Sequence, residues 1–163
     1  MSTLSIEQQI NNLRPVVMSG LALNFHNWLV ASAIALVILS YFLRNPVLLM
    51  VAFFLGGVGL GGRRTGPNLV AAIMAYDTAI PTTGMVSITI TCWDMDNHYH
   101  ALVQEHRQPD WEYEFIPQGW EPTAGIHAVR IWRTGSDGPP ALTAVDAGIL
   151  IPRNNPEQKR VDL

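Results

Sequence analysis

Two long stretches without a charged residue limit what this chain can fold into. Trp28–Leu43 is apolar apart from two serines, and Val47–Gly62 follows after the short break Arg44-Asn45-Pro46. About 20 helical residues cross the hydrocarbon core of a bilayer, so Phe25–Leu43 is long enough to span it and Pro46–Gly62 is just adequate. Proline disfavours helix at the preceding residue, which makes the break a turn. The pattern predicts a transmembrane helical hairpin over residues 24–62 rather than a buried helical hairpin in a soluble core.

The composition agrees with a membrane segment attached to a domain of ordinary polarity. Charged residues make up 14% of the chain, against about 25% in typical soluble domains. Between residues 15 and 76 the only charges are Arg44, Arg63 and Arg64. The net charge of −3 gives no electrostatic case for binding nucleic acid. The single cysteine, Cys92, excludes an internal disulfide and a cysteine-based zinc site.

The arginines near the ends of the two spans predict the orientation. Arg14, Arg63 and Arg64 lie on the side of the chain termini, whereas Arg44 lies alone in the turn. The positive-inside rule then places both termini and the C-terminal domain in the cytoplasm or its equivalent. The first residues lack the pattern of a cleaved secretory signal, so we expect the first span to remain as an anchor. The expected location is an inner (cytoplasmic) or energy-transducing membrane.

The segments that flank the hairpin have helical patterns of their own. In residues 1–23, Ser5 and Gln8 have the spacing of a capping box, and an amphipathic helix ended by Pro15 should follow. This helix lies either in the membrane interface or against its own protein or a partner. In residues 63–83, Pro67 suits the first turn of a second, short surface helix, which would lead into a linker.

The second span ends in a glycine-rich run that has two interpretations. Gly57 and Gly61 are spaced by four residues, so they share one helix face and would let a second helix approach closely. Gly57, Gly59 and Gly62 also form the pattern G-x-G-x-x-G, which occurs in dinucleotide-binding loops. No alternating strand–helix pattern follows, so helix packing is the preferred interpretation.

From Met85 onward the apolar period changes to two. Val86, Ile88, Ile90 and Cys92 alternate with more polar residues, which is typical of a half-buried strand. Turn signals separate further short strands, at residues 101–104, 111–116, 127–133, and 142–145 with 148–151. This spacing predicts a small antiparallel sandwich over residues 84–152, followed by a polar tail at 153–163. Gly119-Trp120-Glu121-Pro122 together with Gly125–Ile131 resembles the late strands of immunoglobulin-like adhesion modules, which implies an immunoglobulin-like sandwich.

Histidines provide the candidate ligand residues. On an extended strand His98 and His100 point to one face, as two metal ligands should, and Asp94, Asp96 or His106 would complete the set. The neighbouring Asp94, Asn97 and Glu105 make this the densest polar cluster, although a solvated hairpin end would have the same composition. His26, at the start of the first span, is a candidate axial ligand for a haem or chlorin ring. We expect Trp93, Trp111, Trp120 and Trp132 to be core residues before they are a ligand platform.

The sequence contains no arrangement typical of an enzyme. Serines and histidines occur without a nucleophile elbow, and Cys92 is expected on the buried face of its strand. We therefore predict a non-catalytic accessory subunit that braces neighbouring subunits of a larger integral-membrane complex, such as a respiratory or photosynthetic one. Its partners would be other membrane subunits and the lipid bilayer, and no cofactor is predicted. The alternative is a membrane-anchored metal-binding protein that uses the cluster around His98 and His100.

Overall fold

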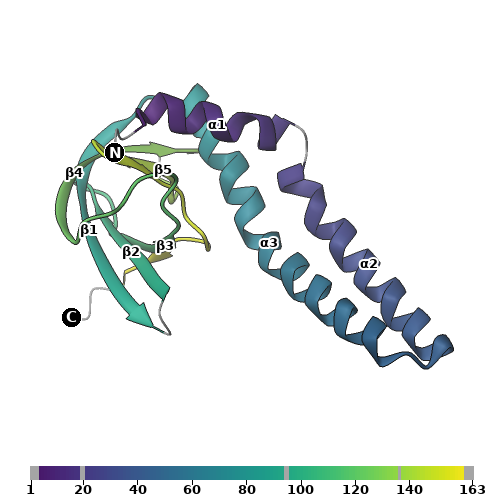
Figure 1. Ribbon diagram of the computed structural model, residues 1–163. Coiled ribbons are helices and arrows are strands. Elements are labelled where there is room, and N and C mark those ends of the chain that lie inside the picture. Colours follow the sequence, from purple (N-terminus) through teal and green to yellow (C-terminus); the bar gives the residue numbers. More distant parts are fainter. Residues whose placement is uncertain (1–3, 19–20, 94–95, 136, 160–163) are drawn as a thin grey trace.

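The computed structural model consists of three helices and one antiparallel sheet (Figure 1). It describes residues 4–159 except 19–20, 94–95 and 136, and only the backbone of residues 21–23 and 62–64. The helices are α1 (Ile6–Met18), α2 (Leu21–Leu43) and α3 (Pro46–Thr78). The strands are β1 (Thr82–Trp93), β2 (Asp96–Gln104), β3 (Trp111–Phe115), β4 (Gly125–Arg133), β5 (Pro140–Val145), β6 (Gly148–Leu150) and β7 (Glu157–Gln158).

Helix α1 begins with the predicted capping box. The backbone N–H of Ser5 donates to Oε1 of Gln8 at 3.0 Å, and the N–H of Gln8 donates to Oγ of Ser5 at 3.2 Å. The expected end at Pro15 is wrong, because α1 continues through it to Met18. A proline inside a helix removes only one backbone hydrogen bond. Packing of the preceding turns compensates, since Ile10 is fully buried and Arg14 pairs with Asp77 of α3 at 2.5 Å.

Helices α2 and α3 form the predicted hairpin. The side chain of Asn45 caps α3 by accepting a hydrogen bond from the N–H of Val47 at 3.0 Å, and Pro46 occupies the first helical turn. The hydroxyl of Ser40 donates to the carbonyl of Asn45 at 2.9 Å, which ties the end of α2 to the turn. Both helices are long and apolar enough to span a membrane, over Asn24–Leu43 and Pro46–Thr78.

The predicted division between a second span and a separate surface helix is wrong. Helix α3 continues for 33 residues through Gly66 and Pro67 and ends at Thr78. Pro67 again removes only one N–H donor, whereas the residues beyond it are held by packing, because Ala72 and Ala75 are fully buried against the sheet domain. One helix therefore leads from the hairpin turn directly to the sheet.

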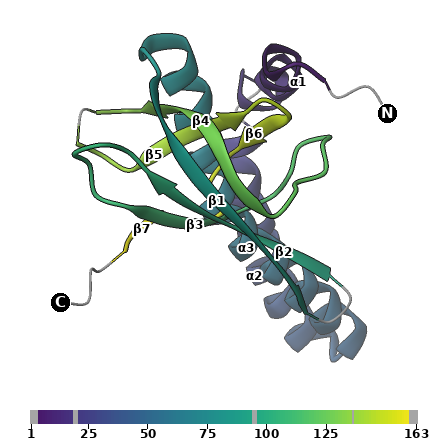
Figure 2. The same ribbon diagram turned by 90° about the vertical axis from the view of Figure 1, so that its left-hand side faces the viewer.

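The seven strands form a single sheet in the order β6-β5-β4-β1-β2-β3-β7. All its pairings are antiparallel, and the predicted strands of the C-terminal domain are present within a few residues of their expected bounds. Because the strands share one hydrogen-bonded sheet, the expected immunoglobulin-like sandwich of two sheets is not confirmed. Figure 2 shows the sheet in front of the helices, with the β1–β2 hairpin extending beyond the other strands.

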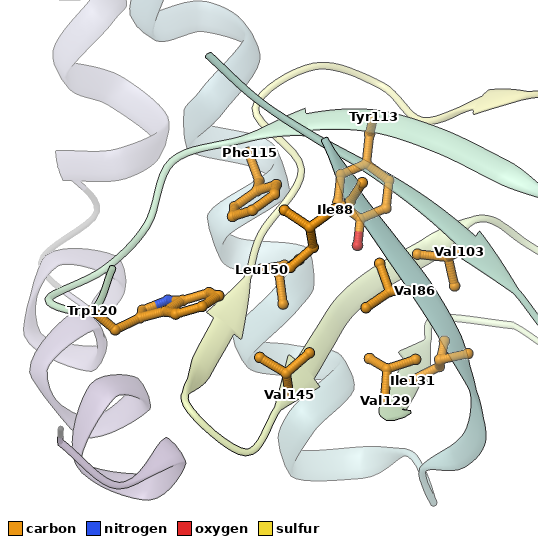
Figure 3. Close-up of a cluster of buried hydrophobic side chains, with 11 residues drawn as sticks. Val86, Ile88, Val103, Tyr113, Phe115, Trp120, Val129, Ile131, Val145 and Leu150 are labelled. Atoms are coloured by element: carbon orange, nitrogen blue, oxygen red, sulfur yellow. The ribbon is translucent and has the colours of Figure 1, made fainter. Parts of the chain in front are cut away.

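The sheet curls until its two ends meet around a core. The hydroxyls of Tyr113 on β3 and Thr143 on β5 lie 2.6 Å apart, although three strands separate β3 from β5 in the sheet order. Phe115 of β3 forms a bridge with Pro152, just beyond β6. Figure 3 shows the enclosed side chains pointing toward one another, including Val86, Ile88 and Leu150. The C-terminal segment, expected to be only a polar tail, closes this space and then pairs with β3 as β7.

A second apolar cluster joins the outer face of the sheet to the helices. It contains residues from α1, α3, β4, β5 and β6, namely Ile10, Ala72, Ala75, Trp132, Ala141, Leu142, Ala144, Ile149 and Ile151. The rings of Tyr76 on α3 and Trp132 on β4 lie 5.4 Å apart between centroids. Gln9 of α1 accepts a hydrogen bond from the N–H of Ile149 at 3.1 Å and so covers the edge strand β6. Within the chain, α1 thus packs on its own protein.

Candidate functional site

A cleft of about 1220 Å³ separates α3 from the β1–β2 hairpin, and we call it the α3–hairpin cleft. One wall is α3, and the other consists of the ends of β1 and β2. Segments that are far apart in the sequence meet here: the lining residues are Leu60, Gly61, Thr65, Thr91, Cys92, Trp93, His98, His100, Glu114, Arg153 and Asn154. Among the described residues, the cleft therefore combines apolar side chains with several hydrogen-bond donors and the carboxylate of Glu114.

Glu114 is the electrostatic centre of this cleft. Its Oε1 lies 2.9 Å from Nδ1 of His98 and 3.3 Å from Nη1 of Arg153. The hydrogen bond from His98, and then the charge of Arg153 and of the histidines, hold the pKa of the Glu114 carboxyl below its usual range despite partial burial. The carboxylate is thus already paired with two side chains, while the His100 side chain makes no hydrogen bond to any residue that the structure describes.

The predicted metal ligands are only partly brought together. His98 and His100 project from one face of β2 and both line the cleft. Asp96 is exposed at the end of the same strand, and Asp94 lies outside the described residues. His106 lies in the turn beyond the opposite end of β2, which is about 20 Å from His98 along the strand. Among the described residues, no three His, Cys, Asp or Glu side chains form a group that could hold a metal ion.

Glu105 has a different role from the one expected for the polar cluster. Its carboxylate pairs with the Arg133 guanidinium at 2.7 Å, and both side chains are nearly buried, at 12% and 8% exposed. Arg133 also donates to the carbonyl of Gly138. Removing one partner of such a pair leaves a buried charge without compensation, so loss of either Glu105 or Arg133 alone should destabilise the domain.

His26, the candidate axial ligand, lies in α2 where α3 passes close by. Its side chain is buried, and Nδ1 has no hydrogen-bond partner among the described residues. A Cβ added to Gly59 of α3 would lie 3.2 Å from the carbonyl oxygen of His26. The imidazole is therefore enclosed near the contact of the two helices rather than directed into the α3–hairpin cleft.

The glycines that contact α2 are not the two selected from the sequence. A Cβ at Gly59 would lie 3.0 Å from Val30 and 3.1 Å from Leu29, and one at Gly56 would lie 3.6 Å from Ala33. A Cβ at Gly57 or Gly61 would meet no atom within 4 Å. Gly59 therefore permits the close approach of α2, whereas a Cβ at Gly56 would make only ordinary van der Waals contact. Packing of Gly57 and Gly61 against a helix of another subunit stays a prediction. The G-x-G-x-x-G pattern lies inside α3 and forms no strand–turn–helix loop.

The structure differs from the sequence-based expectations at several tryptophans and cleft residues. Trp120 and Trp132 are core residues as predicted, but Trp93 is 78% exposed, and Cys92 is exposed rather than buried. The β1–β2 hairpin extends past the core, so alternation no longer indicates burial at its end. Arg153 comes from the supposed tail, and no local signal could have placed it beside Glu114.

No protein-family model, curated protein or solved structure matches the chain.

Proposed function

We propose that the chain is a non-catalytic accessory subunit, anchored by α2 and α3, that braces its neighbours in a larger integral-membrane complex. The observation that carries the proposal is the apolar surface of the hairpin. Outside the contact between the two helices, large side chains are exposed, such as Trp28, Phe53 and Phe54 at 73%, 73% and 71%. Continuous apolar surface of this size would be unfavourable in water, and it suits lipid or the helices of other subunits.

The attachment of the sheet domain supports a bracing role. Helix α3 is continuous from the hairpin turn to the sheet, and the second apolar cluster fixes its last turns to β4 and β5. The Arg14 guanidinium forms two hydrogen bonds with the Asp77 carboxylate, at 2.9 and 2.5 Å, and so ties α1 to the same end of α3. A domain held in this way transmits the position of the membrane helices rather than moving independently of them.

The arginine bias supports a cytoplasmic domain in such a complex. Arg44 lies in the turn between α2 and α3, whereas Arg14 lies in α1. Figure 1 shows this turn at the far end of the hairpin from α1 and the sheet. Both termini then share one face of the membrane. An energy-transducing assembly, respiratory or photosynthetic, is the class of complex that we propose.

Native electrophoresis of membranes solubilised in a mild detergent tests the proposal. We expect the chain to migrate with a larger assembly and to dissociate only in a harsher detergent. Migration as the isolated chain under the mildest conditions that release it from the membrane would contradict an accessory role.

A second candidate is the binding of a metal by His98 and His100. It is favoured by the Glu114–His98 contact, because ligating histidines usually donate their second ring N–H to a carboxylate, which here would leave Nε2 of His98 free. The remaining ligands would come from water or a partner, since the described residues supply no third one. Elemental analysis of the purified protein tests this: a stoichiometric metal that is lost in the His98→Ala, His100→Ala double variant would support it. A protein free of metal after purification without chelators would rule it out.

A further inference from the structure

The end of the β1–β2 hairpin exposes a large aromatic side chain. Trp93 is the last residue of β1, pairs with Asp96 across the hairpin and is 78% exposed. In the same domain, Trp120 and Trp132 are 9% and 4% exposed. An indole ring is largely apolar and carries one N–H donor, so it is most stable where one side is apolar and the other is wet.

The end of the β1–β2 hairpin lies beside the part of α3 where the uncharged run ends. Thr91, Cys92 and Trp93 line the α3–hairpin cleft together with Leu60, Gly61 and Thr65 of α3. These α3 residues mark the end of the uncharged run Val47–Gly62, where a spanning helix leaves the hydrocarbon. Figures 1 and 2 both show the hairpin extending from the sheet in the same direction as α2 and α3. Trp93 is therefore at the level where α3 enters the bilayer.

We propose that the β1–β2 hairpin is a membrane-contacting arm, with Trp93 in the boundary between the headgroups and the acyl chains. The proposal rests on the membrane anchoring by α2 and α3 proposed above. Trp is enriched at this depth, where its ring meets the acyl boundary and its N–H meets the headgroups. Asp96, exposed beside it, stays in the aqueous layer and limits how deeply the arm enters. The arm adds a second contact with the bilayer, which fixes the rotation of the sheet domain about α3.

The single cysteine makes the arm directly testable. Cys92 is exposed and adjacent to Trp93, so an environment-sensitive fluorophore can be attached there without any substitution. The full-length protein is labelled and reconstituted into phosphatidylcholine vesicles that contain lipids with a quencher at the headgroup or in the upper acyl chain. We expect quenching of the probe at Cys92 by both lipids. The Trp93→Ala variant, labelled in the same way, should lose this quenching.

The matched control carries the probe at the opposite end of the same strand. Met85 is 43% exposed and lies about 23 Å from Cys92 along β1, on the side away from α3 residues 60–65. A probe attached to the Met85→Cys, Cys92→Ser variant should stay in water and escape quenching by either lipid.

Carbonate extraction of the same vesicles separates failure of the arm from failure of the anchor. If the protein resists extraction while the Cys92 probe is unquenched, the arm does not contact the membrane and the inference is overturned, with the anchor intact. Unchanged quenching in the Trp93→Ala variant would equally overturn it, since Trp93 would not hold the arm at the surface. Release of the protein by carbonate would instead overturn the membrane anchoring itself.

Discussion

Glu114 is the residue at which the charges of the α3–hairpin cleft meet. Its pKa is lowered, first by the hydrogen bond from His98, so the folded protein binds a proton at this site less readily than the unfolded chain. The ionised form stabilises the fold above the usual pKa of about 4.5, and this stabilisation is lost as the pH falls through the lowered value. We expect Glu114→Gln to lower the free energy of unfolding by about 1 kcal/mol at neutral pH and to converge with the parent protein in acid.

Denaturant unfolding of the detergent-solubilised protein, followed by tryptophan fluorescence at neutral and acidic pH, measures this difference. Glu112→Gln is the matched control, because Glu112 lies two residues away on the same face of β3, is exposed and forms no side-chain hydrogen bond or ion pair within the described part of the chain. An equal pH dependence for the two variants would mean that the Glu114 contacts contribute nothing.

For individual residues, the sequence alone pointed to some of the side chains that line the cleft, but it gave no sign that a cleft exists. His98 and His100 could be assigned to one face because a strand alternates with period two, and the structure agrees. The contact of Glu114 with Arg153 depends on how the chain returns after β6, and no spacing within the sequence reports such a contact. Burial at Cys92 was mispredicted because the alternation continues past the point where the core ends.

Among the elements, the contact of α2 with α3 depends on Gly59 more than on Gly57 or Gly61. Gly59→Leu would place its Cβ within about 3 Å of Val30 and Leu29, whereas a Cβ at Gly61 would meet no atom within 4 Å. We expect Gly59→Leu to destabilise the hairpin by about 1–3 kcal/mol, as overpacking does, and Gly61→Leu to leave it unchanged. Thermal unfolding of the two purified variants in detergent compares them. Equal losses of stability would contradict this assignment of helix faces.

The same pair of variants tests whether a partner helix lies against Gly61. Gly61→Leu should insert normally, since leucine favours insertion. If a helix of another subunit packs on this face, the variant should no longer migrate with the parent assembly on a native gel. Unchanged migration at normal stability would mean that no helix of another subunit packs on Gly57 and Gly61.

The elements themselves were largely predictable, and the errors have a common origin. The capping box, the Asn45 turn and the strand around Val86 and Ile88 are set by neighbouring residues, so local patterns reveal them. The continuity of α3 through Pro67 and the pairing of β7 with β3 depend on contacts with distant segments. The curl of the sheet also depends on such distant contacts. It joins all the strands into one sheet, although short strands had indicated a sandwich of two sheets.

For the whole molecule, the hairpin and the arginine bias give a definite prediction of topology. The protein should stay in the membrane fraction after carbonate or high-salt washing, because removing α2 and α3 from lipid would expose their apolar side chains to water. Protease added to intact cells should leave the sheet domain uncut, and protease added to inverted vesicles should digest it. Digestion in intact cells would reverse the orientation and place the domain outside the cytoplasm.

The continuity of α3 has a mechanical consequence. The helix is about 50 Å long, and its last 16 residues, beyond the apolar run, form a lever of about 24 Å that ends in the sheet domain. A spanning helix changes its tilt when the bilayer becomes thinner or thicker. A tilt of about 10° would displace the end of this lever by about 4 Å, and the domain fixed to it would follow. In the proposed membrane complex, a change of membrane thickness would thereby alter the height and angle at which the domain meets its neighbours.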